Sequence, residues 1–250
     1  MPDPNLKLSA VRAMAYAIRA IDQHLMTCHV FAPHSSRELI AKEDWLDFHM
    51  AQSYVWRDRI YPLVANDYGF GKPVGMSEPT YERAVQAAEF GYSFPDASVV
   101  RNQAFWSMFA GGYFTYGADP LYNFRPGWRD LLQLEGARWL KTFRQFMLAR
   151  QWWTYRPRQD IWVEGMGSGL SLNTAVYSRE DDTMLLYFSR PSSATVRLDV
   201  LKTPVRFAKW IDPVSFSEYP TRSHSRENTI TVTTPQGWLD ALLIIQGEGG

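Results

Sequence analysis

A glutamate followed by proline is the feature of this sequence best suited to chemistry. Glu78 closes a short apolar stretch that begins at Pro73, and Pro79 ends that strand because proline cannot donate to a β-ladder. Residues at the carboxyl ends of strands line the active sites of parallel β/α proteins. We therefore predict that Glu78 is a catalytic carboxylate for an uncharged polar substrate such as a sugar. The alternative is a structural carboxylate paired with an arginine. Glu82 is expected only to support it through a hydrogen bond.

Other polar side chains fall near predicted strand ends and could shape a sugar subsite. His29 and Gln52 each end a predicted strand, Tyr116 follows another, and Tyr81 lies just beyond the glutamate. Arg101, on a predicted helix, could orient the glutamate or bind a sugar hydroxyl. All five are predicted to bind substrate. A satisfied core histidine and a solvated surface arginine are the alternatives for His29 and Arg101.

The elements that must position these residues alternate between strand and helix over the first part of the chain. Strands are expected at 25–30, 45–52, 73–77 and 113–116, and helices at 8–21, 54–68, 97–110 and 128–148, with a loop at 31–40. This alternation predicts parallel strands with right-handed crossovers, equal to the C-terminal half of an eight-stranded (β/α)8 TIM barrel. From residue 161 onward, short strand-like runs predict a small antiparallel β-sandwich. The fold class is α/β plus all-β, with domains at 1–152 and 157–250.

Composition excludes several classes of function. The 250 residues contain 26 Lys+Arg and 26 Asp+Glu, so zero net charge gives no electrostatic reason to expect nucleic acid or a membrane as partner. The single cysteine, Cys28, forbids an internal disulfide and a zinc finger of the Cys2His2 type. The glycine-rich stretches lack the lysine of a phosphate loop, and we expect neither a metal nor a cofactor. No signal peptide or membrane-length apolar run is visible, and localisation is not predicted.

An ordered series of motifs resembles apiosidase-like glycoside hydrolases. It runs through Leu-Met-Thr-Cys-His at 25–29, Trp-Leu-Asp-Phe-His-Met-Ala-Gln-Ser at 45–53, Lys-Pro-Val at 72–74, Ser-Glu-Pro-Thr-Tyr-Glu at 77–82 and Arg-Asn-Gln-Ala-Phe-Trp at 101–106. The resemblance implies hydrolysis of glycosidic bonds in polysaccharide side chains by two carboxylates, with Glu78 as the nucleophile-type glutamate. It also implies that the C-terminal part corresponds to a sandwich labelled a collagen-binding domain in these enzymes.

The resemblance places the acid/base aspartate of the family after an earlier strand that this chain does not contain. We therefore expect a truncated form with little activity alone, and self-association through the exposed edges of the half barrel. The alternative function is a non-catalytic module that binds carbohydrate or collagen through residues 157–250.

Overall fold

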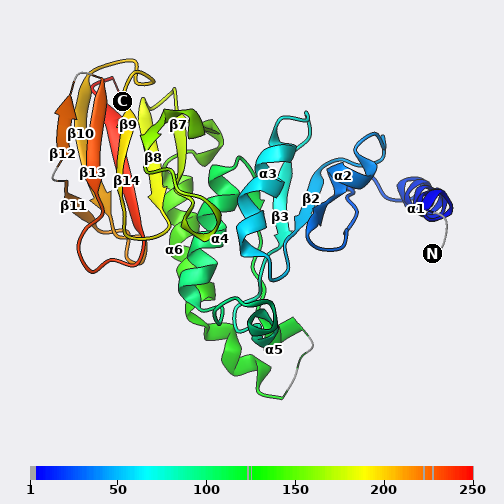
Figure 1. The fold of residues 1–250 in the computed structure, drawn as a ribbon. Coiled ribbons are helices and arrows are strands. Elements are labelled where there is room, and N and C mark those ends of the chain that lie inside the picture. The colour runs from blue at the N-terminus through cyan, green and yellow to red at the C-terminus, as the bar shows by residue number, and fades with distance from the viewer. Residues whose placement is uncertain (1–3, 123, 125, 222, 227, 250) are drawn as a thin grey trace.

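The computed structural model describes residues 4–122, 124, 126–221, 223–226 and 228–249. Figure 1 shows a mixed α/β part, coloured blue to green, beside a part built of antiparallel sheets, coloured yellow to red. The helices of the α/β part are α1 (Pro4–Arg19), α2 (Ser36–Ile40), α3 (Ile60–Tyr68), α4 (Ala97–Phe109), α5 (Asp119–Tyr122) and α6 (Glu135–Ala149). Among the helices described, none has both the length and the apolar character needed to cross a membrane.

The sheet of the α/β part has the strand order β1-β2-β3-β4 within the described residues. Its strands are β1 (His34–Ser35), β2 (His49–Gln52), β3 (Val74–Glu78) and β4 (Tyr113–Phe114). Strands β2, β3 and β4 are parallel, whereas β1 pairs with β2 in the antiparallel sense. The predicted parallel sheet is confirmed for three strands. The described strands form an open sheet and not a closed barrel.

Helices α3 and α4 cover the parallel sheet because their apolar positions coincide with its inward side chains. Ile60 and Val64 of α3 and Trp106 of α4 share a buried cluster with Val74 and Met76 of β3. The α4 helix begins where the sequence predicts, since the Asp96 carboxylate accepts hydrogen bonds from the amides of the first turn. These two helices therefore hold β3, and with it Glu78, in a fixed position.

The prediction of a strand at 25–30 is wrong, because no strand is assigned to these residues. Met26 donates its amide to the Asp47 carboxylate at 2.6 Å, and the Thr27 hydroxyl donates to the Phe48 carbonyl at 2.8 Å. Because side chains take up part of its hydrogen bonding, this apolar segment runs beside the start of β2 without forming a ladder. Leu25 is 78% exposed, residues 26–28 are half-buried and Val30 is buried, so the segment is covered only in part.

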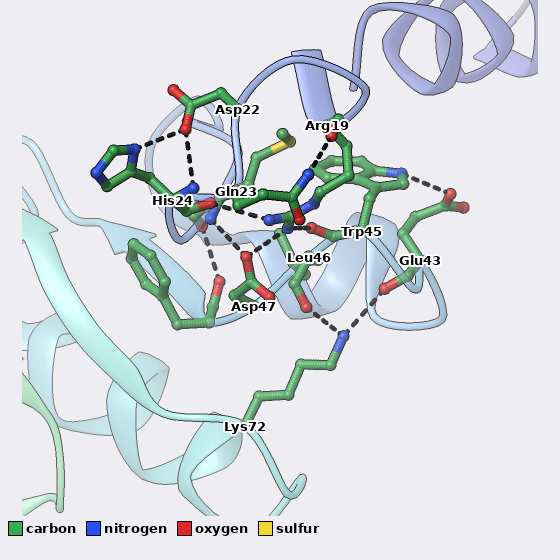
Figure 2. A network of polar contacts seen from close by, with 12 residues as sticks. Arg19, Asp22, Gln23, His24, Glu43, Trp45, Leu46, Asp47 and Lys72 are labelled. Atoms are coloured by element: carbon green, nitrogen blue, oxygen red, sulfur yellow. Dashed lines mark hydrogen bonds and ion pairs between the residues drawn. The ribbon is translucent and has the colours of Figure 1, made fainter. Parts of the chain in front are cut away.

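Polar contacts attach α1 to the same region (Figure 2). The Asp47 carboxylate accepts a hydrogen bond from Arg19 at 2.5 Å, and Lys72 donates to the carbonyls of Glu43 and Leu46. The Arg19 hydrogen bond, followed by that from the Met26 amide, holds the pKa of Asp47 below its usual range. Charged side chains thus join the first helix to the start of β2, beside an apolar cluster of Ala15 with Trp45 and Leu46.

Three further predictions change in detail. The segment 31–40 was expected to be a loop but contains β1 and α2, which begins with a capping box formed by Ser35 and Glu38. The helix predicted at 54–68 divides into a 3₁₀ turn, η1 (Arg57–Arg59), and α3. The helix predicted at 128–148 divides into η3 (Trp128–Gln133) and α6, because Leu134 adopts an extended ψ of 147°.

Two antiparallel sheets follow, as the sequence predicts. The described strands give the orders β11-β10-β14-β8-β7-β5 and β12-β13-β9-β6. Their bounds are β5 (Tyr155–Pro157), β6 (Trp162–Glu164), β7 (Thr174–Ser178), β8 (Thr183–Phe188), β9 (Ser193–Arg197), β10 (Val205–Ile211), β11 (Glu218–Pro220), β12 (Ser223–Arg226), β13 (Thr229–Thr233) and β14 (Ala241–Gly247), with the short 3₁₀ turns η2 (Val85–Phe90), η4 (Trp152–Thr154), η5 (Gln159–Ile161) and η6 (Gly169–Ser171) elsewhere in the chain.

The larger antiparallel sheet is buried on both faces. Along β8, Met184, Leu186 and Phe188 join the core between the two antiparallel sheets. The alternate residues Leu185 and Tyr187 join a second core with α4 and α6. Side chains alternate between the faces of a strand, so the unbroken apolar run of β8 is what a sheet between two layers requires. Helices α4 and α6 of the α/β part and the larger antiparallel sheet therefore share one apolar core.

Candidate active site

Glu78 is the last residue of β3, at the carboxyl-terminal edge of the parallel sheet. It pairs in register with Gln52, the half-buried last residue of β2, just after an irregularity that follows Ala51. The Ser53 amide donates to the Glu78 carbonyl at 3.0 Å. The fold therefore brings Gln52 and Glu78 together at the edge where parallel β/α proteins carry reactive groups.

Two of the predicted residues contact the Glu78 carboxylate directly. His29 Nε2 lies 2.7 Å from Glu78 Oε2, although His29 comes from the irregular segment before β2 and not from a strand end. The Tyr81 hydroxyl also hydrogen-bonds this carboxylate, and burial together with the negative charge of Glu78 raises the pKa of Tyr81 to about 12. Tyr81 therefore stays protonated near neutral pH and donates to Glu78. The Glu78 side chain is 21% exposed, so it stays accessible to a ligand.

Glu78 opens into a cavity of about 200 Å³ rich in tyrosine. The cavity is lined by Tyr54, Val55, Glu78, Thr80, Tyr81, Ala84, Gln86, Asp119 and Tyr122. The rings of Tyr81 and Tyr122 are 5.8 Å apart and tilted by 59°. Aromatic faces beside carboxylates and hydroxyls suit a sugar ring, because the ring faces are apolar and the edges carry hydroxyl groups.

Asp119 is a carboxylate in the cavity lining that was not predicted from the sequence. It begins α5, it is 5% exposed, and its amide donates to the Glu82 carbonyl at 2.9 Å. A signal was present in the sequence, since Asp119 follows β4 as Glu78 ends β3, and parallel strands end at one edge of a sheet. Tyr54 was missed for a different reason: it lay inside a predicted helix, whereas its observed φ of 49° places it in a turn.

Tyr116 contacts Glu82, not Glu78. Its hydroxyl donates to Glu82 Oε2 at 2.5 Å, and the Gly136 amide donates to Glu82 Oε1 at 3.2 Å. Burial, and then the Glu82 carboxylate, raise the pKa of Tyr116. Glu82 is 4% exposed, and it ties the loop after β3 to the start of α6. The predicted role of Tyr116 in substrate binding is therefore corrected, because its hydroxyl is bound to Glu82.

Arg101 also lies apart from the Glu78 cavity. Its Nε and Nη2 donate to the two carboxylate oxygens of Asp240 at 3.1 and 2.9 Å, and both side chains are about 5% exposed. Burial lowers the pKa of Arg101, but the Asp240 hydrogen bond and charge outweigh it and raise the pKa overall. Arg101 joins α4 to the residue before β14, so the expectation that it orients Glu78 is corrected. The sequence could not reveal a partner 139 positions away.

Comparison with protein families gives one match. Residues 2–154, more than half of the chain, match the family described as "Apiosidase-like, catalytic domain". A search of curated proteins finds no match.

Solved structures share the fold of nearly the whole chain. One titled "Glycoside hydrolase" has a TM-score of 0.83 and 22% sequence identity, over 96% of this chain and 61% of its own length. A glycoside hydrolase family 5 protein from Bacteroides vulgatus ATCC 8482 also has a TM-score of 0.83, with 23% identity over 96% of this chain and 59% of its own. The chain thus spans about three fifths of the length of either structure.

Proposed function

Because this chain belongs to the apiosidase-like family of glycoside hydrolases, we propose that the Glu78 cavity is the sugar subsite of a glycosidase. The substrate class is a polysaccharide side chain joined by an O-glycosidic bond. The observation that carries the proposal is the convergence of His29 and Tyr81 on a strand-end carboxylate that opens into a cavity lined by tyrosine rings.

Glu78 acts in this proposal as nucleophile or general base toward the anomeric carbon or its attacking water. His29 and Tyr81 donate to the carboxylate, which holds it in one orientation and balances part of its charge. Gln52 and Asp119 bind sugar hydroxyls, and the Tyr81 and Tyr122 rings pack against the apolar faces of the sugar. Arg101 and Tyr116 take no part in the subsite, since their polar groups bind Asp240 and Glu82.

Hydrolysis needs a second carboxyl group placed as acid or base. The family resemblance assigns that role to an aspartate after an earlier strand, and the sheet of the described residues is open. We therefore propose that the 250-residue chain binds sugar but turns it over slowly or not at all. Residues 1–152 and 157–250 are proposed as its two domains. The pairing of β5 with β7 supports a boundary before Tyr155.

The first test measures sugar binding by the purified chain with ligand-observed NMR against a panel of pentoses and hexoses. Tyr122→Ala and Asp119→Asn are expected to weaken binding of the preferred sugar. Tyr219→Ala, an exposed tyrosine on β11 outside the cavity, serves as the matched control and should leave binding unchanged. Equal binding by all of these variants would place the sugar elsewhere.

The second test concerns catalysis. In a longer protein that supplies the remaining strands, Glu78→Gln is expected to lower kcat at least about 100-fold, the scale of losing a positioned acid–base group. In the 250-residue chain, turnover should be too slow to measure both with and without this change. Turnover of an aryl glycoside by the 250-residue chain that disappears in Glu78→Gln would contradict the proposed inactivity while supporting the role of Glu78.

Binding of carbohydrate or collagen by residues 157–250 stays a prediction, because the family match ends at residue 154.

A further inference from the structure

We propose that a second cavity, between α4 and the antiparallel sheets, binds a small hydroxylated carboxylate of the sugar-acid class. Arg57 and Arg190 would bind the carboxylate. The cavity has a volume of about 260 Å³ and is lined by Arg57, Ser93, Ser98, Val99, Asn102, Gln103, Trp106, Leu170, Ser189, Arg190, Pro191, Leu239 and Asp240. Its sugar preference rests on the proposed function, whereas its preference for an anion rests on the charges of the cavity itself.

Arg57 is the main support for an anionic ligand. It is 5% exposed, and its Nε has no hydrogen-bond partner in the part of the chain that the structure describes. One guanidinium nitrogen, Nη2, donates to the Ser93 hydroxyl at 3.2 Å, and the guanidinium lies 5.0 Å from the centre of the Tyr92 ring. Within the described residues Arg57 forms no ion pair. A buried charge without a counter-ion is costly, so this site gains when an anion enters it.

A second arginine and a buried serine also line this cavity. Arg190 is exposed at the rim, where its Nε donates to the Leu170 carbonyl at 3.1 Å. Ser189 is 2% exposed, and its hydroxyl has no partner. Burial lowers the pKa of Arg57. Tyr92 and the Asp96 carboxylate counter this in part, and the positive charge of Arg190 adds to the lowering. The cavity therefore combines two neighbouring cations with unsatisfied donors.

The nearby carboxylates offset this charge only in part. Asp240 lines the cavity, but its oxygens accept from Arg101 and from the Tyr187 hydroxyl. The Asp96 carboxylate is occupied in capping α4, where it accepts from the Ser98 amide and hydroxyl and the Val99 amide. Both acids already have partners, which leaves the arginines available to an external carboxylate.

The remaining lining favours a sugar acid over a simple anion. Ser93, Ser98 and Asn102 offer hydroxyl and amide groups for several ligand hydroxyls, and Leu239 supplies an apolar surface at the rim. The volume is just below the roughly 300 Å³ at which small-molecule sites usually begin, which suits a single sugar unit.

The two cavities are neighbours across one side-chain contact. Thr80, which lines the Glu78 cavity, exchanges two backbone hydrogen bonds with the Gln103 amide at 2.8 and 3.1 Å, and Gln103 lines the second cavity. An acidic unit in the second cavity would thus lie beside a sugar in the first. Thr80 and Gln103 are both buried and joined by two hydrogen bonds, so they separate the two cavities.

Isothermal titration of the full chain with sodium D-glucuronate, D-glucose and sodium phosphate tests the proposal. Glucuronate should bind, and glucose should bind at least about tenfold more weakly, as expected for the loss of charge-assisted hydrogen bonds. Arg190→Ala, an exposed change that should preserve folding, is expected to weaken glucuronate binding several-fold. Arg57→Gln should abolish it, and Arg206→Ala, an exposed arginine outside the cavity, should have no effect.

Glu78→Gln separates this proposal from the proposed glycosidase function. Glucuronate binding that persists in Glu78→Gln supports a distinct site, whether or not the glycosidase proposal holds. Loss of binding in that variant would place the ligand in the Glu78 cavity and overturn the inference. Equal affinity for glucose, tighter binding of phosphate than of glucuronate, or no effect of Arg190→Ala would overturn it as well.

Discussion

The two ends of the α/β part bury their apolar side chains to very different extents. Beside the antiparallel sheets, Phe105 of α4 stacks on Tyr187 of β8 with ring centres 4.1 Å apart, and both residues are fully buried. Helix α1 lies at the opposite end (Figure 1). There Ile18 is 50% exposed, and Ile21 just beyond the helix is 88% exposed. Both helical regions are rich in apolar residues. Whether such residues form a core therefore depends on the layer that packs against the helix and not on the helix sequence alone.

A similar contrast holds for charged pairs. Arg101 and Asp240 are both almost fully buried, whereas in the Arg12–Glu43 pair the arginine is 50% exposed and only the carboxylate is buried, at 7%. A buried pair becomes costly when one partner is removed, because the other charge stays desolvated. Removing one partner of a pair that water reaches costs little stability, because water solvates the remaining charge. Substitutions in both regions can therefore compare how much each end contributes to the free energy of unfolding.

The largest effect is expected at the buried ion pair. Arg101→Met leaves the Asp240 carboxylate buried without its cation, and should lower the free energy of unfolding by about 3–5 kcal/mol. Urea denaturation followed by tryptophan fluorescence measures this loss. The matched change Arg12→Met should have a clearly smaller effect. The double variant Arg101→Met/Asp240→Leu should recover much of the stability, and failure to recover would show that packing, not the stranded charge, dominates.

Helix caps give a smaller and more local contrast. Asp96→Ala removes the cap of α4, which packs against both the parallel sheet and β8, and should cost about 1 kcal/mol of global stability. Ser35→Ala removes the cap of the short helix α2. We expect Ser35→Ala to raise amide hydrogen exchange in α2 more than it lowers the global unfolding midpoint. Equal effects of both changes on that midpoint would show that the two ends unfold as one unit.

His49 makes the stability of the β2 region depend on pH. Burial lowers its pKa below the ordinary value of about 6.5, so the unfolded chain binds a proton more readily than the folded one. This contribution to stability is present above about pH 6.5 and is lost as the pH falls through that value toward the folded pKa. Thermal unfolding of the chain and of His49→Gln between pH 5 and 7.5 tests it. The variant should show a flatter dependence, and parallel curves would contradict the assignment.

The smallest change in stability is expected on α1. Ile18→Ser with Ile21→Ser alters exposed positions, so the free energy of unfolding should stay within about 0.5 kcal/mol. Self-association at high concentration should decrease, since exposed apolar side chains favour contact between copies. Sedimentation velocity of both proteins provides the measurement. Unchanged association would place any contact between copies elsewhere.

Local signals in the sequence were sufficient for several elements. Pro79 marks the end of β3, Asp96 marks the start of α4, and the unbroken apolar run of β8 indicates a strand buried on both faces. Each signal acts within a few residues, through a missing amide donor, a capping carboxylate or a continuous apolar pattern. The edge position of Glu78 could therefore be predicted before any fold was known.

Partners distant in sequence could not be predicted in this way. The segment 25–30 has the apolar composition of a strand, but hydrogen bonds to Asp47 and Phe48 hold it outside the sheet. Arg101 and Tyr116 carry the right chemistry for a sugar site, but the folded chain directs them to Asp240 and Glu82. Amino-acid type limits what a side chain can do, whereas its partner depends on which elements pack together.

By itself, the sequence determined the strand that ends in Glu78, the capped helix beside it and the change from α/β to antiparallel sheets. These follow from hydrogen-bonding capacity and apolar periodicity over short distances. Tertiary packing decides that His29 and Tyr81 contact the Glu78 carboxylate and that Asp119 lines the same cavity as Glu78. It also decides that Arg57, in the lining of the second cavity, is buried without an ion pair among the described residues. Such meetings depend on the packing of segments far apart in the chain, which no local pattern specifies.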